Sequence, residues 1–315
     1  INYDYKGRYL FEVSGRYDGT SRFKQGYRWG FYPSASMGWR ISEESFFGDA
    51  KKVVDNLKLR ASFGSLGNQI VRDTNHNQVY YTYMRLVTLH NFAGYTFGDG
   101  GTLGKYSSLG APVASDLTWE TAQQWDLGLD VAMFNNRFNL TGDVYIRDTK
   151  DMLTAGIALP GVYGAASPNM NAADLRTKGY ELTVSWRDQF QLAGKPFEYS
   201  VGFNISDYKS VITKYDNPDN SLAKPYYVGM QLGEIWGFKT DGFFKTTEEA
   251  QAYAKEVDLS YSSGRLTGGW QAGDLKFVDL DGNHIWDVGE NKVGKSGDKT
   301  ILGNELPTFS YGINA

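Results

Sequence analysis

The chain alternates between apolar and polar residues over long stretches, and the clearest stretch spans residues 123–148. Its apolar positions before the turn are Trp125, Leu127, Leu129, Val131 and Met133, and after the turn they are Phe138, Leu140, Val144 and Ile146. A period of two is typical of a strand with one dry face and one wet face. The joint at Asn135-Asn136 favours a tight hairpin, because asparagine tolerates the left-handed backbone that such turns require.

The same alternation recurs along the chain and predicts about nine strands. The apolar sets are Tyr9, Phe11, Val13 and Tyr17; Leu57, Leu59, Ala61 and Phe63; Tyr180, Leu182, Val184 and Trp186; and Phe197, Tyr199, Val201, Phe203 and Ile205. A weaker strand carries Ala35, Met37, Trp39 and Ile41. Pro33 in this strand cannot donate to a ladder, so a bulge or irregularity is expected there.

The links between these strands are alternately short and long. In chain order they fall at Lys6-Gly7, 19–28, 42–56, 65–118, Asn135-Asn136, 150–177, 188–196 and about 211–306. In an up-and-down antiparallel sheet, alternate links lie at the same end, so all the longer loops gather on one side. Outer-membrane barrels are built in this way, with short periplasmic turns and long extracellular loops.

Two features favour a membrane barrel over a soluble β-sandwich or propeller, which would also alternate. The predicted strands run for about ten residues or more, which matches a tilted bilayer crossing. Aromatic residues stand at the ends of the apolar faces, where an interfacial girdle would lie: Tyr9, Tyr17, Trp125 and Trp186. The fold class predicted is therefore all-β, a transmembrane antiparallel up-and-down β-barrel, whose strands must close because lipid satisfies no backbone hydrogen bond.

The polar face of such a barrel is predicted to line a hydrated interior. Charged residues at polar positions are Glu12, Arg16, Arg60, Asp126, Asp130, Asp143, Glu181 and Arg187. These side chains are expected to keep the wall hydrated.

The composition is that of a sheet-rich chain with wide aromatic surfaces. The 315 residues include 22 tyrosines, 18 phenylalanines and 8 tryptophans, which are residues that favour strands. The formal net charge of −4 gives no electrostatic reason to propose a nucleic-acid partner. The chain has no run of about 18 apolar residues, so no transmembrane helix is predicted. The absence of cysteine excludes disulfides and thiolate metal sites. The first residues lack the features of a signal peptide, so the chain is expected to begin inside a fold.

No catalytic constellation emerges from the sequence. The three histidines, His76, His90 and His284, do not stand at metal-ligand spacing to one another, and there is neither a glycine-rich phosphate loop nor a cysteine nucleophile. The carboxylates are numerous, but no pair stands out as an acid and a base. The sequence therefore predicts that the protein is not an enzyme and needs no cofactor.

The most specific local motif is DLDGNHIWDVGE, residues 279–290. Its oxygen donors fall at the first, third, fifth, ninth and twelfth places of a calcium loop: Asp279, Asp281, Asn283, Asp287 and Glu290. The carbonyl of Ile285 would serve at the seventh place. His284 stands where such loops need glycine for a sharp turn, so the alternative is an acidic surface loop held by Asx-turns.

A short helix is predicted inside the last long loop. The segment from Thr246 to Val257 opens with a capping box, in which Thr246 is the cap and Glu249 follows three residues later. Aromatic residues surround this segment: Tyr226, Tyr227, Trp236, Phe238, Phe243, Phe244 and Trp270. They would either stack on sugar rings or a partner's surface, or pack as the small core of the loop itself.

Several segments resemble the barrel of the SusC/RagA family of TonB-dependent outer-membrane transporters of Bacteroidetes. They agree in order along the chain: YDYKGRYLFEVSGRYDGTSRF, RWGFYPSASMGWRISEESFF, LKLRASFGSLGNQ, DLTWETAQQWDLGLDVAMFNNRFNLTGDVYIRDTKDML, TKGYELTVSWR and GDLKFVDLDGN. The family usually has a second glycine in the last segment, so His284 is a departure that puts the transfer of metal binding in doubt.

The resemblance implies that residues 1–315 are part of a single 22-stranded barrel domain. It also implies an N-terminal plug before Ile1, closing strands after Ala315, energy from the TonB–ExbB–ExbD complex and a SusD-like surface lipoprotein as a lid. The charged wall residues would then also hold the plug. The function implied is active import of a nutrient across the outer membrane, with an oligosaccharide or a peptide as substrate. The alternatives are a passive porin-like channel and a soluble sugar-binding β-domain.

Overall fold

The computed structural model describes residues 1–72, 77–96, 103–110, 112–156, 160–164, 167–263 and 269–315. The chain forms two compact units, residues 1–216 with 308–315, and residues 217–307. The second unit lies in the chain between the last two strands of the first. No helix in the described part of the chain has both the length and the apolar character needed to span a bilayer.

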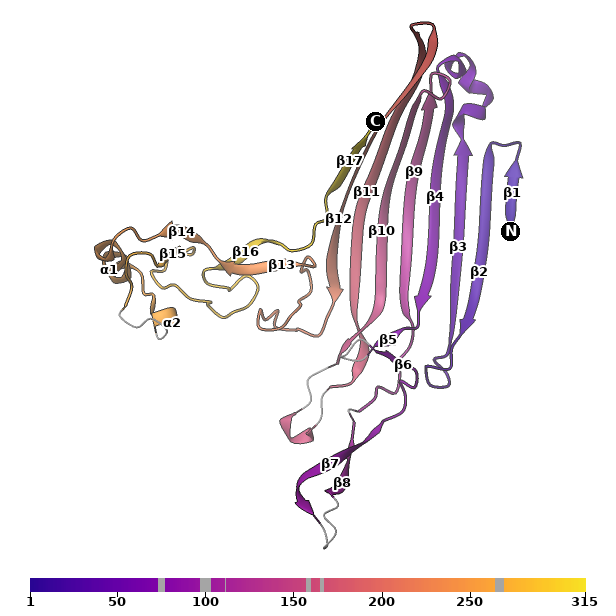
Figure 1. The fold of residues 1–315 in the computed structure, drawn as a ribbon. Coiled ribbons are helices and arrows are strands. Elements are labelled where there is room, and N and C mark those ends of the chain that lie inside the picture. Colours follow the sequence, from indigo (N-terminus) through magenta and orange to yellow (C-terminus); the bar gives the residue numbers. More distant parts are fainter. Residues whose placement is uncertain (73–76, 97–102, 111, 157–159, 165–166, 264–268) are drawn as a thin grey trace. The chain divides into compact units, whose positions relative to one another are not determined.

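The first unit is built on one antiparallel sheet, in which nine strands of the described residues pair in the order of the chain (Figure 1). These strands are β1 (Asn2–Tyr5), β2 (Tyr9–Gly19), β3 (Trp29–Arg40), β4 (Val54–Asn68), β9 (Glu120–Met133), β10 (Phe138–Ala155), β11 (Asn169–Leu192), β12 (Lys195–Lys214) and β17 (Ser310–Asn314). The predicted up-and-down meander is confirmed.

The alternation of short and long links is also confirmed. Short turns join β1 to β2, β9 to β10 and β11 to β12, and two 3-10 helices, η1 (Ile41–Glu43) and η2 (Ser45–Lys52), join β3 to β4. The long links lie at the opposite ends of the strands (Figure 1). The link between β10 and β11 is shorter than predicted, since these strands continue to Ala155 and begin at Asn169. Their pairing passes two register shifts near Met152, which interrupt the alternation that marks a strand in the sequence.

The hairpin between β9 and β10 shows why asparagine stands at its centre. Phe134, Asn135 and Asn136 have φ values of 60°, 59° and 61°, in the left-handed region. A side chain at the start of the neighbouring strand β4 also holds the turn, because Asp55 accepts a hydrogen bond from the Asn136 amide at 2.9 Å.

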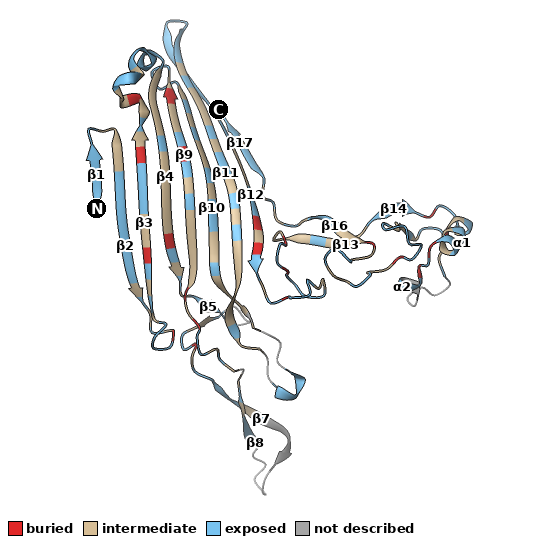
Figure 2. Cartoon of the chain, turned by 180° about the vertical axis from the view of Figure 1, so that it is seen from behind, coloured by how far each residue is buried: buried red, intermediate tan, exposed pale blue. Residues whose placement is uncertain are grey.

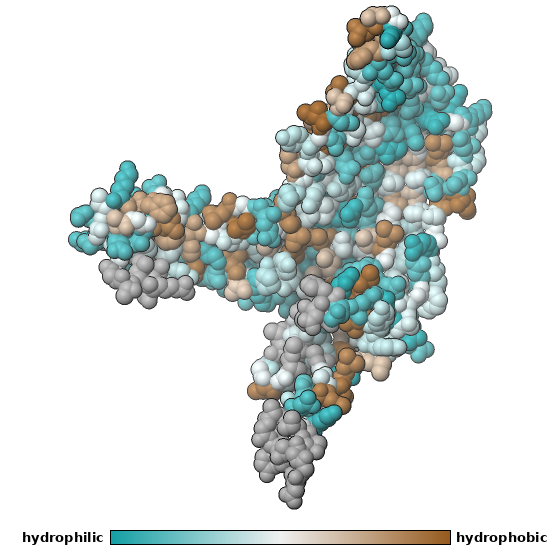
Figure 3. Space-filling view, in the orientation of Figure 1, coloured by the Kyte–Doolittle hydropathy of each residue, from teal (hydrophilic) through white to brown (hydrophobic). Residues whose placement is uncertain are grey.

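The sheet has one apolar face, as the period of two predicted. Leu127 lies directly opposite Ala61 on β4 and Val144 on β10, so the apolar positions form continuous rows across the strands. These side chains are not covered by other parts of the chain: the exposed fractions are 62% for Trp125, 48% for Leu127 and 54% for Val144. Figure 2 accordingly shows strands that are mostly intermediate or exposed, with few buried positions. The opposite face is the polar one, and the side of the sheet seen in Figure 3 is largely hydrophilic.

The bulge expected at Pro33 is absent. β2 and β3 pair without a register shift, and Pro33 lies opposite Gly15. On the other side of β3, the pairing with β4 also has no register shift and ends at Ser34. Pro33 therefore stands just beyond that ladder, where its missing N–H costs no bond to β4.

The long links of the first unit carry small elements of their own. These are β5 (Val71–Arg72), β6 (Gln78–Val79), β7 (Val87–Thr96), β8 (Leu103–Leu109) and η3 (Gly161–Tyr163). A buried cluster anchors them at the strand ends: Phe23, Tyr32, Val71, Leu117 and Trp119. The Trp119 indole N–H also donates to the Arg28 carbonyl at 3.2 Å, which ties the start of β9 to the link between β2 and β3.

The second unit has its own core. Its elements are β13 (Glu234–Phe238), β14 (Thr240–Phe243), α1 (Thr247–Glu256), α2 (Ser260–Ser263), β15 (Leu275–Phe277) and β16 (Lys299–Asn304). The predicted helix is confirmed as α1, with the Thr246 hydroxyl accepting a bond from the Glu249 amide at 3.1 Å. Most of the predicted aromatic set packs inside this unit: Tyr227 and Phe244 are buried, and Phe238 and Trp270 pack against buried Trp286 and its neighbours.

Candidate functional site

A charge cluster lies on the polar face of the sheet and centres on Arg60 of β4. Its guanidinium donates to Asp130 through Nε at 2.9 Å and to Asp143 through Nη2 at 2.9 Å. The three side chains are between 20% and 31% exposed. The cluster therefore joins β4, β9 and β10 on the side away from the apolar rows.

The reach of Arg60 to Asp143 depends on Gly128, because β9 lies between their two strands. Gly128 is directly opposite Arg60 on one side and Asp143 on the other. A Cβ atom at this position would lie 2.3 Å from Asp143 Oδ1 and 2.6 Å from Arg60 Nη2. The absence of a side chain thus allows the ion pair to pass over the strand.

The other predicted wall residues lie on the same face, and only some of them join the cluster. Glu181 is directly opposite Asp143, and Asp126 is one polar position from Gly128 on β9. The remaining predicted residues lie apart from the cluster. Glu12 is opposite Ser36, Arg16 pairs with Asp18 on its own strand, and Arg187 lies 3.7 Å from Glu198 with both side chains largely exposed.

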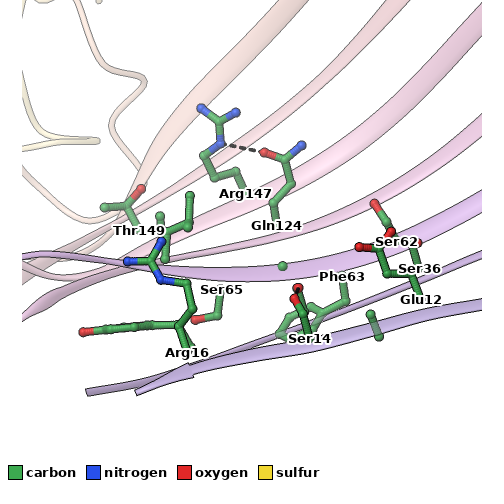
Figure 4. A pocket seen from close by; sticks show the side chains of 16 residues that line it. Glu12, Ser14, Arg16, Ser36, Ser62, Phe63, Ser65, Gln124, Arg147 and Thr149 are labelled. Carbon is green, nitrogen blue, oxygen red and sulfur yellow. Dashed lines mark hydrogen bonds between the residues drawn. The ribbon is translucent and has the colours of Figure 1, made fainter. Parts of the chain in front are cut away.

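A groove of about 780 Å³ runs along this face near the long-link ends of the strands (Figure 4). Its polar lining includes Ser14, Arg16, Ser34, Ser36, Ser62, Ser65, Gln124 and Arg147. The Ser14 and Ser34 hydroxyls lie 2.7 Å apart, and Arg147 Nε donates to Gln124 Oε1 at 2.9 Å. Four of these serines, Ser14, Ser34, Ser36 and Ser62, stand at the polar positions of the alternation, which was a readable signal for them in the sequence.

A second hollow, of about 810 Å³, lies among the loops. Arg22, Gln69, Gln78 and Tyr80 contribute to its lining. The guanidinium of Arg22 lies 5.1 Å from the centre of the Tyr80 ring. A flat aromatic face next to amide and guanidinium donors is suited to polar ligands with an apolar face, such as sugars and peptides.

The acidic loop brings together a set of carboxylates that differs from the predicted one. Ligand atoms of Asp279, Asp281 and Asp298 lie within 4.8 Å of one another. Asp298 is fully buried and accepts bonds from the amides of Leu280 and Asp287. It stands outside the 279–290 motif, so the spacing of that motif gives no sign of it.

The rest of the predicted ligand set is held in other bonds. Glu290 is paired with Lys295 at 2.6 Å and Lys292 at 3.5 Å, and Asp287 and Asn283 accept bonds from backbone amides of the loop. His284 takes the turn position with φ 65°, and its amide donates to Asp279. Partial burial opposes ionisation of Asp279, but the amides of His284 and Gly282 outweigh it and lower its pKa. These Asx-type bonds are those expected for the alternative, an acidic surface loop whose conformation is held by its own side-chain to backbone hydrogen bonds.

The histidines form no metal site among the described residues. His90 lies 2.7 Å from the Ser108 hydroxyl and stacks on Tyr106, and the acidic trio is the one group of three metal-ligating side chains found in this part of the chain. His76 lies outside the described residues.

Comparison with known families identifies the barrel. The profile of the family described as TonB dependent receptor-like, beta-barrel matches residues 1–306. The chain belongs to this family. TonB-dependent receptors are outer-membrane transporters and not enzymes, so the predicted location in the outer membrane and the predicted absence of enzymatic activity are confirmed at the level of the family.

The relatives agree with this family and include SusC, and the solved structures agree with its fold. The chain is 34% identical over 305 residues to the TonB-dependent receptor SusC of Bacteroides thetaiotaomicron, covering 96% of this chain and 28% of that protein. It is 28% identical over 326 residues to the TonB-dependent receptor P3 of Formosa agariphila, covering 100% of this chain and 29% of that protein. The chain thus spans less than a third of the length of these relatives.

The fold is that of a solved transporter. The structure of the RagAB peptide transporter superposes with a TM-score of 0.71 at 21% identity, covering 99% of this chain and 30% of that chain. In a TonB-dependent receptor barrel, the apolar rows through Leu127 face lipid, and the polar face with Arg60 faces the lumen.

Proposed function

We propose that the whole protein imports a nutrient across the outer membrane, with energy from the TonB–ExbB–ExbD complex. The observation that carries this proposal is the lumen wall, where the Arg60 cluster and the serine-lined groove face inward on a sheet whose other side is apolar. Such a wall offers hydrogen bonds and fixed charges to a plug and to a polar solute. The family of the barrel supports the same activity.

A passive porin-like channel is the competing proposal, and energy dependence separates the two. Uptake by cells that carry the full-length protein should stop when TonB is deleted or the proton gradient is collapsed. Uptake that persists at its full rate under both conditions would establish the passive channel instead. The soluble sugar-binding alternative is wrong, because the chain belongs to an outer-membrane barrel family.

The proposed substrate is an oligosaccharide or a peptide, received with the help of a SusD-like surface lipoprotein. The RagAB relative is described as a peptide transporter, and SusC is the relative named above. The serine hydroxyls, Gln124 and Arg147 of the groove can bond the hydroxyl or amide groups of either class. The second hollow adds an aromatic face at Tyr80.

The groove can be tested with a paired variant. Replacing Gln124 and Arg147 with alanine should lower the rate of uptake and leave the amount of folded barrel unchanged. The matched control is Lys195→Ala, at the far end of β12. If both variants import at the parental rate, the groove takes no part in transport.

We also propose that the acidic loop takes a calcium ion, held by Asp279, Asp281 and Asp298. Three carboxylates converge within 4.8 Å, and hard cations prefer such oxygen ligands. Calcium should raise the thermal midpoint of the second unit in the full-length protein, and Asp281→Asn should abolish that increase. Asp219→Asn, elsewhere in the same unit, is the control. A midpoint that does not respond to calcium, or responds equally in all three proteins, would leave a self-supported acidic loop.

A further inference from the structure

Two lysines lie directly opposite each other on the lipid-facing side of the sheet. Lys178 of β11 and Lys209 of β12 are register partners, and both are exposed. Lys178 shares its side of the sheet with Tyr180, and on the other flank it lies opposite Ile146. Like charges in direct cross-strand contact destabilise a sheet unless another group compensates them.

The nearby carboxylates compensate this pair only in part, because they are also bonded to other groups. Asp148 binds Arg176 through both of its oxygens, at 2.6 and 2.8 Å, and Asp207 accepts a bond from the Tyr208 amide. Among the described residues, neither lysine has a carboxylate within ion-pair distance. Lys150 on β10 is exposed and also lacks an ion pair within that part of the chain. These residues form a basic patch. It carries four cationic side chains, Lys150, Arg176, Lys178 and Lys209, and two carboxylates, Asp148 and Asp207.

The level of the patch along the barrel is fixed by the register. The row that contains Lys178 and Lys209 continues through Ile146 to Trp125, an exposed tryptophan. Towards the short turns the next row contains Val144, Tyr180 and Asp207, and the row after it contains Leu182 and Ile205. The long links of this family lie outside the cell, so the patch stands at the extracellular rim of the apolar band, where the outer-leaflet headgroups begin.

We propose that Lys178 and Lys209 together bind the phosphate group of an outer-leaflet glycolipid. A phosphate between the two ammonium groups would remove their mutual repulsion and accept several charge-assisted hydrogen bonds. The acyl chains of the same lipid would lie on the apolar rows below, over Val144 and Tyr180. This continuous apolar surface is the reason for assigning a lipid rather than free inorganic phosphate.

The test uses the full-length protein in detergent and a purified phosphorylated lipid A as the probe, with bound lipid counted by native mass spectrometry. The variant Lys178→Gln/Lys209→Gln should bind about 25-fold less, since each lysine at a headgroup contributes roughly a fivefold effect. Lys195→Gln, on β12 at the opposite end, should bind like the parent. Lipid A from which the phosphate has been removed should bind the parent as weakly as the phosphorylated form binds the variant.

Three results would overturn the proposal. They are equal binding by parent and double variant, equal binding of the two lipid forms, and displacement of the lipid by millimolar inorganic phosphate, which would indicate a free-anion site. Lys178→Arg/Lys209→Arg keeps the charge and should keep the lipid, so a folding defect in the glutamine variant would not hide the answer. The test does not depend on transport, so its outcome is independent of the proposed import.

Discussion

Arg60 and Asp143 form an ion pair over the backbone of Gly128, the residue that stands between them on β9. The pair crosses β9 and connects β4 with β10, which are not adjacent in the sheet. The guanidinium also binds Asp130, so one arginine fixes two carboxylates on the lumen wall.

A methyl group at Gly128 should therefore break this arrangement. Gly128→Ala places a Cβ atom within 2.6 Å of both partners, so the pair must move apart. We expect the free energy of unfolding to fall by about 1 kcal/mol, the upper range for a partly exposed ion pair. The measurement is urea unfolding of the full-length protein in detergent.

Gly64→Ala is the control for that substitution. Gly64 stands on the same face of β4, and the nearest atom to its added Cβ lies 4.0 Å away. Arg60→Ala should remove the difference between alanine and glycine at position 128. An equal cost for both glycine substitutions, or a cost at Gly128 that survives the loss of Arg60, would contradict the role assigned to Gly128.

The same cluster shows what can be read from the sequence and what cannot. Alternation identified Arg60, Asp130 and Asp143 as residues of the polar face, because facing is a property of each strand alone. Which of them form contacts depends on the register between β4, β9 and β10 and on Gly128, which the alternation of side chains does not mark. In the acidic loop, Asp298 was missed for a related reason, since the chain between it and Asp279 has no repeating pattern that would indicate their approach.

Glu44 ties β2 and β3 together near the short turns, and its role should depend on pH. It accepts bonds from the Tyr9 hydroxyl at 2.5 Å and the Trp39 indole at 3.0 Å, and Arg8 lies 3.5 Å away. The Tyr9 hydroxyl and then the Trp39 indole lower the pKa of Glu44 below 4.5. A lowered pKa means that the stabilisation is present above pH 4.5 and is lost as the pH falls through the folded-state pKa.

Glu44→Gln should accordingly lower the thermal midpoint at pH 7. The difference in midpoint between parent and variant should become smaller as the pH is lowered below 4.5. Thermal unfolding of the full-length protein from pH 7 to pH 3 gives the comparison. Glu43→Gln, next to it and largely exposed with Lys51, should change the midpoint little at any pH. A pH-independent effect of Glu44→Gln would show that charge is not the source of the stabilisation.

The cap of α1 should control the opening of this helix. Thr246→Ala removes the acceptor for the Glu249 amide, which costs a helix typically 0.5–2 kcal/mol. Hydrogen exchange at Glu249 should become faster in the full-length protein, while Thr246→Ser should retain the parental rate because it keeps the hydroxyl. Unchanged exchange in the alanine variant would mean that the second unit's core alone holds the helix.

The apolar rows are predicted to touch lipid, and a charge placed there should prevent assembly. Leu129 lies on the apolar face of β9, opposite Leu59 and Gly142. Leu129→Lys should cost about 2–4 kcal/mol if this position is near the middle of the bilayer, because a lysine there loses its hydration. The fraction of heat-modifiable, folded protein in the outer membrane measures this cost.

Thr141→Lys provides the opposite case, because Thr141 is on the lumen face directly across from Asp130. A lysine at this position stays hydrated beside a carboxylate, so the folded fraction should remain that of the parent. Comparable losses for the two lysine variants would mean that hydrocarbon does not contact the Leu129 side. Since the two positions lie on adjacent strands in consecutive rows of the sheet, the difference between them reports the facing of the sheet and not its local stability.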